Sequence, residues 1–215
     1  MNATNIKQLI QRAESGDATA MHEIGHSYAC GQNGVEQDHH RAARWYQRAA
    51  GAGYAPAMVD LGYMFINGLG LERDEKRALQ QFLHAARLGS EEAMRNIAVM
   101  YIQGNAVEQD FAKAMKWLRA AAHRGCSFSM TYIGMMYFNG DGVEVDDQQA
   151  LRWFMRAADR GNGQAMHLLA IMYERGRGVE ASPEEAAHWR QRAEKAGYKA
   201  NEGGYAWQRS PDTAD

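Results

Sequence analysis

One short segment of the chain carries side chains of the kinds that do chemistry. His22, Glu23 and His26 spell H-E-x-x-H, and on a helix this spacing places two imidazoles on one face with a carboxylate beside them. In zinc hydrolases the two histidines bind the metal and the glutamate activates a water molecule. No downstream segment supplies a third ligand. We therefore predict no catalytic residue, metal or cofactor, and leave open whether the His22 and His26 pair binds metal adventitiously.

A second set of polar side chains could recognise a polypeptide rather than a metal. Asn67, Gln103 and Asn139 are amides at equivalent places, each directly before a glycine. An amide can satisfy both the N–H and the C=O of a bound backbone. The alternative is that these amides hydrogen-bond the last carbonyl groups of their own helices. The sequence leaves both interpretations open.

These residues belong to a repeat that runs through most of the chain. Five glycines each follow a Tyr or Phe by three residues, at intervals of 37, 36, 36 and 36 residues by subtraction. The glycines are Gly31, Gly68, Gly104, Gly140 and Gly176. A fixed period in the range of roughly 20–50 residues is typical of a solenoid, in which one small unit stacks on copies of itself.

Each repeat predicts two helices joined by a turn that contains glycine. In the first helix, Met58, Leu61 and Phe65 lie on one stripe of a helix with a period of 3.6 residues. Gly68 and Gly70 then permit the positive φ that ends a helix. A residue that can cap the second helix follows at a fixed place in each repeat: Asp38, Asp74, Asp110, Asp146 and Ser182.

The second helix carries alanines beside a large residue, as in Ala150, Trp153 and Ala157. Together with Gly134 and Tyr137 of the first helix, this pattern resembles the Sel-one-like repeat family, relatives of the tetratricopeptide repeats with a longer loop between the helices. The resemblance implies an all-α fold, a right-handed α-α superhelical solenoid of five helix-turn-helix repeats with an N-terminal cap helix. The expected divisions are a cap helix at 1–17, five repeats at about 18–53, 54–89, 90–125, 126–161 and 162–197, and a C-terminal cap remnant with a flexible tail at 198–215.

Composition and charge exclude several classes of partner. The chain is 46% apolar and has a formal net charge of −2, so it offers no basic stripe for nucleic acid. No run of about eighteen apolar residues could span a bilayer, and the first residues do not form a signal peptide. We therefore expect a cytoplasmic protein that binds no nucleic acid and does not insert into membranes. Cys30 and Cys126 occupy different repeat positions and are expected to be reduced.

The resemblance implies that the first helices line a concave groove. Two positions per repeat then point into this groove, and in the middle repeats they are apolar. A soluble protein seldom exposes a contiguous apolar strip unless a partner covers it. The alternative is that neighbouring first helices pack together and leave little of the strip exposed. The expected partner-binding residues are Tyr63, Ile66, Asn67, Arg95, Val99, Ile102, Gln103, Met135, Phe138, Asn139 and Ile171.

The function implied by the resemblance is protein binding. Family members act as scaffolds or adaptors, so we expect a non-catalytic protein that holds an extended or helical partner segment in the groove. One alternative is an immunity protein that neutralises a secreted bacterial toxin domain. A third alternative is a β-lactamase-like or zinc-dependent hydrolase. It is less favoured because the chain lacks paired cysteines and a positioned nucleophile and base.

Overall fold

The computed structural model describes residues 6–199, and within this range it contains eleven helices and no strands. The expected C-terminal cap remnant lies outside the described residues from residue 200 onward. The helices are α1 (Ile6–Glu14), α2 (Ala18–Cys30), α3 (His39–Gly51), α4 (Ala55–Asn67), α5 (Glu75–Arg87), α6 (Glu91–Gln103), α7 (Phe111–His123), α8 (Ser127–Asn139), α9 (Asp147–Ala158), α10 (Gly163–Arg175) and α11 (Pro183–Lys195).

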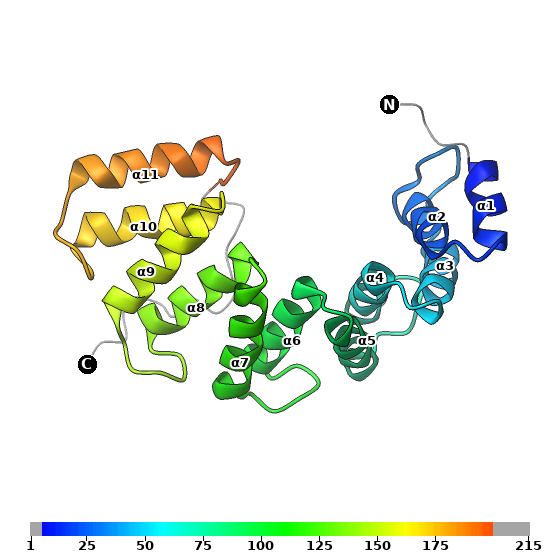
Figure 1. Ribbon diagram of the computed structural model, residues 1–215, viewed down its shortest axis with the longest axis horizontal. Helices are drawn as coiled ribbons and strands as arrows, with labels where there is room; N and C mark the ends of the chain where they lie inside the picture. The colour runs from blue at the N-terminus through cyan, green and yellow to red at the C-terminus, as the bar shows by residue number, and fades with distance from the viewer. Residues whose placement is uncertain (1–5, 200–215) are drawn as a thin grey trace. The chain divides into compact units, whose positions relative to one another are not determined.

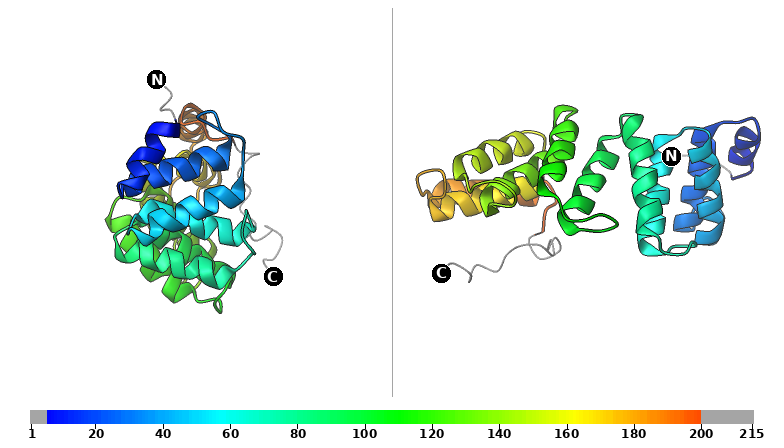
Figure 2. Two further views of the ribbon diagram at one scale, coloured as in Figure 1. Left: turned by 90° about the vertical axis from the view of Figure 1, so that its right-hand side faces the viewer. Right: turned by 90° about the horizontal axis from the view of Figure 1, so that it is seen from below.

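The chain divides into two units, one ending at Gln109 and the other beginning at Asp110. In unit 1, α1 packs on α2, the pairs α2–α3 and α4–α5 form helical hairpins, and α3 and α5 contact the helix that follows each of them. In unit 2, the hairpins are α8–α9 and α10–α11, with α7 against α8 and α9 against α10. The two helices of each hairpin lie side by side in every view (Figures 1 and 2). None of the helices between residues 6 and 199 combines the length and the apolar character needed to cross a membrane.

Side-chain caps begin the second helix of every repeat, as the sequence predicts. The carboxylate of Asp38 accepts from the Arg41 backbone N–H at 2.9 Å, and that of Asp110 accepts from Lys113 at 2.8 Å. The same arrangement recurs at the three remaining predicted caps, Asp74, Asp146 and Ser182. Each cap satisfies one of the amides that a helix start leaves without a partner.

The capping carboxylates predict a loss of stability in acid. Hydrogen bonds from helix-start backbone amides lower the pKa of Asp17, Asp38 and Asp110. A lowered pKa stabilises the fold above the unfolded value of about 3.9, and that contribution is lost as the pH falls through the folded values. Serine at positions 38 and 110 should therefore keep both caps and reduce the acid-induced fall of the urea midpoint, compared at pH 7 and pH 3. An equal fall in the unsubstituted protein and the double variant would contradict this account.

In three repeats, a glycine of the first helix lies in close contact with an aromatic ring of the second helix. A Cβ atom added at Gly62 would lie 2.5 Å from a ring carbon of Phe82, which is fully buried. The other such pairs are Gly25 with Tyr46 and Gly134 with Phe154. The repeats without this ring carry alanine in the first helix: Ala98, where the second helix has Leu118, and Ala170, where it has Arg190. The two departures from the glycine pattern therefore coincide with the loss of the ring.

Candidate functional site

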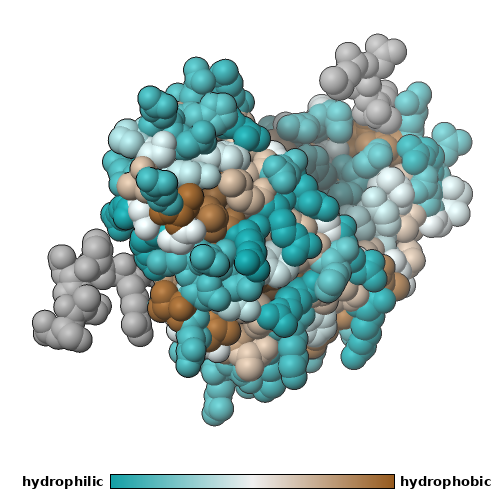
Figure 3. Space-filling view, turned by 60° about the vertical axis from the view of Figure 1, so that its left-hand side comes forward, coloured by the Kyte–Doolittle hydropathy of each residue, from teal (hydrophilic) through white to brown (hydrophobic). Residues whose placement is uncertain are grey.

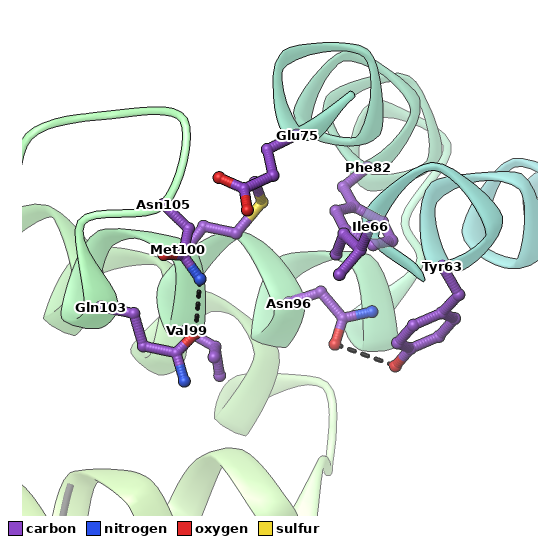
Figure 4. Close-up of a pocket in the computed structure, with 9 residues that line it drawn as sticks. All are labelled: Tyr63, Ile66, Glu75, Phe82, Asn96, Val99, Met100, Gln103 and Asn105. Carbon is purple, nitrogen blue, oxygen red and sulfur yellow. Dashed lines mark hydrogen bonds between the residues drawn. The ribbon is translucent and has the colours of Figure 1, made fainter. Parts of the chain in front are cut away.

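A pocket lies among α4, α5 and α6 of unit 1 and holds about 120 Å³ (Figure 4). It brings together four of the predicted partner-binding residues, of which Tyr63, Ile66 and Val99 are half-buried and Gln103 is exposed. The complete lining is Tyr63, Ile66, Glu75, Phe82, Asn96, Val99, Met100, Gln103 and Asn105. The 3.6-residue period of the helices places α6 residues 96, 99, 100 and 103 on one face, which is the face that borders the pocket.

A hydrogen-bond network fixes one end of this pocket. The Tyr63 hydroxyl donates to Asn96 Oδ1 at 3.1 Å and accepts from Arg95 Nη2 at 3.0 Å. Arg95 also pairs with Glu92 at 3.3 Å. Burial raises the pKa of Tyr63, so the phenol remains protonated at neutral pH and keeps its donor. The network therefore joins α4 to α6 and holds the Tyr63 ring in place, where its edge meets the Phe82 ring at a centroid distance of 5.8 Å.

Asn96 is a pocket residue that the repeat pattern did not predict. Its side chain is 9% exposed, its Oδ1 accepts from Tyr63 and Arg95, and its Nδ2 is buried without a hydrogen-bond partner among the residues that the structure describes. A signal was present in the sequence, because the equivalent positions of the first two repeats are also polar, with Glu23 and Asp60. A polar residue next to a core position in successive repeats marks a polar line along the first helices.

The amides before the repeat glycines bond within their own turns in unit 1. Asn67 Nδ2 donates to the Tyr63 carbonyl oxygen at 2.8 Å, four residues earlier, so this amide caps its own helix. Gln103 Oε1 accepts from Asn105 Nδ2 at 2.9 Å. The Gln103 side chain is exposed and has an amide N–H₂ beyond this bond. Of the two interpretations, helix capping describes Asn67, and Gln103 has donors for an outside group.

Two predicted partner-binding side chains are buried, which corrects their expected exposure. Ile102 and Met135 are each 4% exposed. The loop after α6 returns onto the last turn of that helix, where Gln109 Nε2 donates to the Ile102 carbonyl oxygen at 2.6 Å. In unit 2, the buried amide of Gln164 on α10 lies 3.9 Å from the Met135 sulfur. Both side chains therefore pack inside their units and do not offer surface to a partner.

In unit 2, the predicted residue Phe138 is covered on one side by the chain itself. The guanidinium of Arg177 stacks on the Phe138 ring at 3.6 Å from its centroid, and Nη2 donates to the Phe138 carbonyl oxygen at 2.9 Å. Arg177 Nε also donates to the Asp147 carboxylate at 3.0 Å. Phe138 stays half-buried, and the predicted apolar strip is interrupted at this point.

The remaining predicted residues of unit 2 are half-buried. Asn139 Nδ2 donates to the Asp141 carboxylate at 3.2 Å, within the following turn. Ile171 lies on α10 one turn after His167. Burial, together with the charge of Arg190, lowers the pKa of His167, so this imidazole is neutral at pH 7.

The H-E-x-x-H motif lies on α2, and its two histidines have different surroundings. His22 Nε2 is 2.7 Å from Asp60 Oδ2, and the centroid of its ring lies 5.4 Å from that of Tyr46 and 5.2 Å from that of Tyr54. His26 is exposed, with Nε2 at 3.8 Å from the thiol of Cys30. No group of three or more potential ligands among His, Cys, Asp and Glu comes together in residues 6–199. His22 therefore serves as a link between α2 and α4.

Apolar side chains exposed elsewhere are scattered. Among the described residues, the large apolar side chains with the most exposure include Leu88, Phe128 and Val145, on separate elements. On the face drawn in Figure 3, apolar residues form small separate areas among hydrophilic ones. Single exposed apolar residues are ordinary in soluble proteins, so the unit 1 pocket, with its apolar lining and polar edge, is the stronger candidate site.

The sequence matches a known repeat family over most of its length. Five consecutive segments match the Sel1 repeat, at residues 18–54, 55–90, 91–126, 127–162 and 163–198. The chain belongs to the Sel1 repeat family. The predicted fold class, an all-α superhelical repeat fold, is confirmed by this match and by the helical structure. Sel1 repeat proteins typically mediate protein–protein interactions.

Solved structures share this fold. A protective antigen of uropathogenic Escherichia coli that displays an SLR fold is 39% identical, with a TM-score of 0.81 over 90% of this chain and 41% of that protein. A Sel1 repeat protein from Oxalobacter formigenes is 27% identical, with a TM-score of 0.81 over 90% of this chain and 85% of that protein. An immunity protein from Pseudomonas aeruginosa is 18% identical, with a TM-score of 0.63 over 89% and 73% of the two chains, which is a likeness of fold alone.

One curated protein matches a shorter segment. An ERAD-associated E3 ubiquitin-protein ligase component of Arabidopsis thaliana is 37% identical over 59 residues, which make up 27% of this chain and 9% of that protein. This Sel1 repeat chain thus corresponds to a small part of that relative.

Proposed function

We propose that this Sel1 repeat protein is a non-catalytic scaffold or adaptor that binds a segment of another protein on the first-helix face of unit 1. The observation that carries the proposal is the pocket among α4, α5 and α6, which combines half-buried apolar side chains with one amide donor, Asn96 Nδ2, that has no partner among the described residues. Apolar surface rimmed by polar groups is the usual composition of a protein-binding site. Protein binding is also the typical role of the family.

The contacts proposed in unit 1 are a reduced form of the set expected from the sequence. Tyr63, Ile66 and Val99 offer apolar surface, and Gln103 offers amide donors to a backbone. Arg95 acts through Tyr63, which it holds by a hydrogen bond. The proposed partner is an extended or helical segment, because such a segment can lie along one helix face and place one side chain in a pocket.

A separate set remains proposed for unit 2, where Phe138, Asn139 and Ile171 are half-buried. Ile102 and Met135 are left out of the proposed contacts because they are buried. The absence of a catalytic role is part of the proposal, and the engagement of His22 by Asp60 supports it. A toxin domain as the partner has support from the fold alone, since the similar immunity protein is 18% identical.

Site-specific crosslinking tests the proposed face. Gln103 on α6 and Gln80 on α5 are both exposed glutamines of unit 1, on the first and the second helix of their repeats. With a photoreactive phenylalanine analogue at position 103, we expect a covalent adduct with a cellular protein in extracts of the producing cells. The analogue at position 80 should give at most a tenth of that yield, because Gln80 does not line the pocket and lies on the opposite side of α5 from Glu75 and Phe82. Mass spectrometry of the adducts identifies the partner, a toxin included, and equal adduct formation at the two positions would refute the proposed face.

A further inference from the structure

Asn96, which lines the unit 1 pocket, has a side-chain hydrogen-bond donor without a partner in residues 6–199. Only 9% of the Asn96 surface is exposed to solvent, and the residue lines the pocket. Its Oδ1 is taken by Tyr63 and Arg95, which fixes the orientation of the amide and leaves Nδ2 as the group without a partner among the described residues. In Figure 4 the amide points toward Tyr63 and Ile66. A buried donor without an acceptor is unfavourable, so a group that brings an acceptor to this place gains from it.

The rest of the pocket defines what else such a group must be. Ile66, Phe82, Val99 and Met100 provide apolar walls that suit methylene groups. The carboxylate of Glu75 lies at the α5 side of the same pocket and is paired with Arg73 at 2.5 Å. A second carboxylate entering the pocket would be repelled by Glu75 and would lose its hydration. A cation could approach Glu75, but it would leave the Asn96 donor without an acceptor.

The size of the pocket limits the occupant further. A cavity of about 150 Å³ is large enough for benzene, and the pocket holds about 120 Å³. It therefore admits a short chain of a few heavy atoms and excludes an indole ring. A glutamine side chain fulfils each condition, because it has two methylene groups, a carbonyl oxygen that accepts and an amide that donates.

We propose that the pocket among α4, α5 and α6 is a specificity pocket for a glutamine side chain of the bound partner segment. The glutamine methylenes lie against Ile66 and Val99, its carbonyl oxygen accepts from Asn96 Nδ2, and its amide donates toward the Glu75 and Gln103 side of the pocket. This inference rests on the proposed function, since it assumes that the occupant belongs to a protein. A site built to pair with a polar group discriminates strongly against analogues that leave its own groups unpaired.

Small analogues of side chains test the pocket without the partner. Propanamide reproduces the glutamine side chain, and propanoate has the same shape with a negative charge. In NMR titrations of the full chain, propanamide should shift the Asn96 side-chain amide signals and the Ile66 and Val99 methyl signals, with a dissociation constant on the order of millimolar. Propanoate should bind at least about tenfold more weakly. Unchanged Asn96 signals with propanamide, or equal binding of propanoate, would overturn the assignment.

Two variants locate the binding. Asn96→Asp removes the donor while keeping the shape of the side chain, and Val99→Phe fills the pocket while keeping the donor. Each should weaken propanamide binding by about tenfold or more. Circular dichroism checks the fold of both variants, and the Val99→Phe result decides alone if Asn96→Asp does not fold. If the folded Val99→Phe variant binds propanamide as well as the unsubstituted protein does, propanamide binds outside this pocket and the proposal is wrong.

The crosslinking experiment separates this inference from the proposed function. The partner peptide joined at position 103 should contain a glutamine within a few residues of the attachment point. If adducts form at position 103 and propanamide leaves Asn96 unchanged, the function stands and the glutamine pocket is wrong. If propanamide binds at Asn96 and the adducts show no preference for position 103, the proposed function fails and a partner side chain is not the occupant.

Discussion

Replacing Gly62 with valine should lower the free energy of unfolding by about 3 kcal/mol. Even the first added carbon would lie 2.5 Å from Phe82 Cε1 and 2.7 Å from Cζ, and the ring is fully buried against its neighbours. Inserting atoms into a packed core forces side chains or backbone to move, which costs typically about 1 to 3 kcal/mol, and valine adds three carbons at this contact. Urea denaturation followed by circular dichroism measures the change. Gly51→Ala is the control, because Gly51 is exposed and a Cβ atom there would have no neighbour within 4 Å. The free energy of unfolding of this variant should stay within about 0.5 kcal/mol of that of the unsubstituted protein.

The chain suggests a compensating change for the same contact. The third repeat carries Ala98 and Leu118 where the second has Gly62 and Phe82. The double variant Gly62→Ala with Phe82→Leu should therefore lose less stability than the sum of the two single variants, with a coupling of about 1 kcal/mol. Additive losses would mean that the glycine and the ring do not restrict each other.

The helices and their caps could be predicted because they depend on local sequence. Each repeat of about 36 residues contains its own apolar stripe, such as Met58, Leu61 and Phe65, and its own capping residue. Both signals can therefore be found within a single repeat. Hydrogen bonds from helix-start amides to Asp38 and Ser182, for example, need only residues three positions apart. The Asn67 cap is also local, because its amide bonds the carbonyl oxygen four residues earlier. The sequence was compatible both with this cap and with a contact to a partner backbone.

The candidate site was harder to predict because it depends on what covers each first helix. The helical period predicts which stripe of a helix faces the core. The burial of Ile102 and Met135 depends instead on the loops and neighbouring helices that cover the other stripes. A loop residue, Gln109, and a residue of the next repeat, Gln164, contact these two positions. The role of Asn96 has the same origin, since a polar residue beside the core becomes a fixed, unpaired donor only when Tyr63 of the preceding repeat takes its oxygen.

The turn between α4 and α5 contains two glycines that differ in their surroundings although their backbones are alike. Gly68 has φ of +66° and Gly70 has φ of +64°, so a side chain at either place meets a similar backbone penalty of about 1 to 2 kcal/mol. A Cβ atom at Gly68 would find its nearest neighbour at 3.7 Å, in ordinary contact. At Gly70 it would lie 2.2 Å from the carbonyl oxygen of His39 and 2.6 Å from the backbone nitrogen of His40, at the start of α3.

Gly70→Ala should therefore cost about 3 kcal/mol or more, and Gly68→Ala about 1 kcal/mol, as measured by urea denaturation of the two variants side by side. Backbone atoms cannot rotate out of the way as a side chain can, so the turn must move off α3 to admit the added methyl group. Glu75, which lines the pocket, begins α5 five residues after Gly70. Displacement of the turn should consequently also weaken propanamide binding in the Gly70→Ala variant and leave it unchanged in Gly68→Ala. Equal stability losses in the two variants would show that the close approach to His39 does not position this turn.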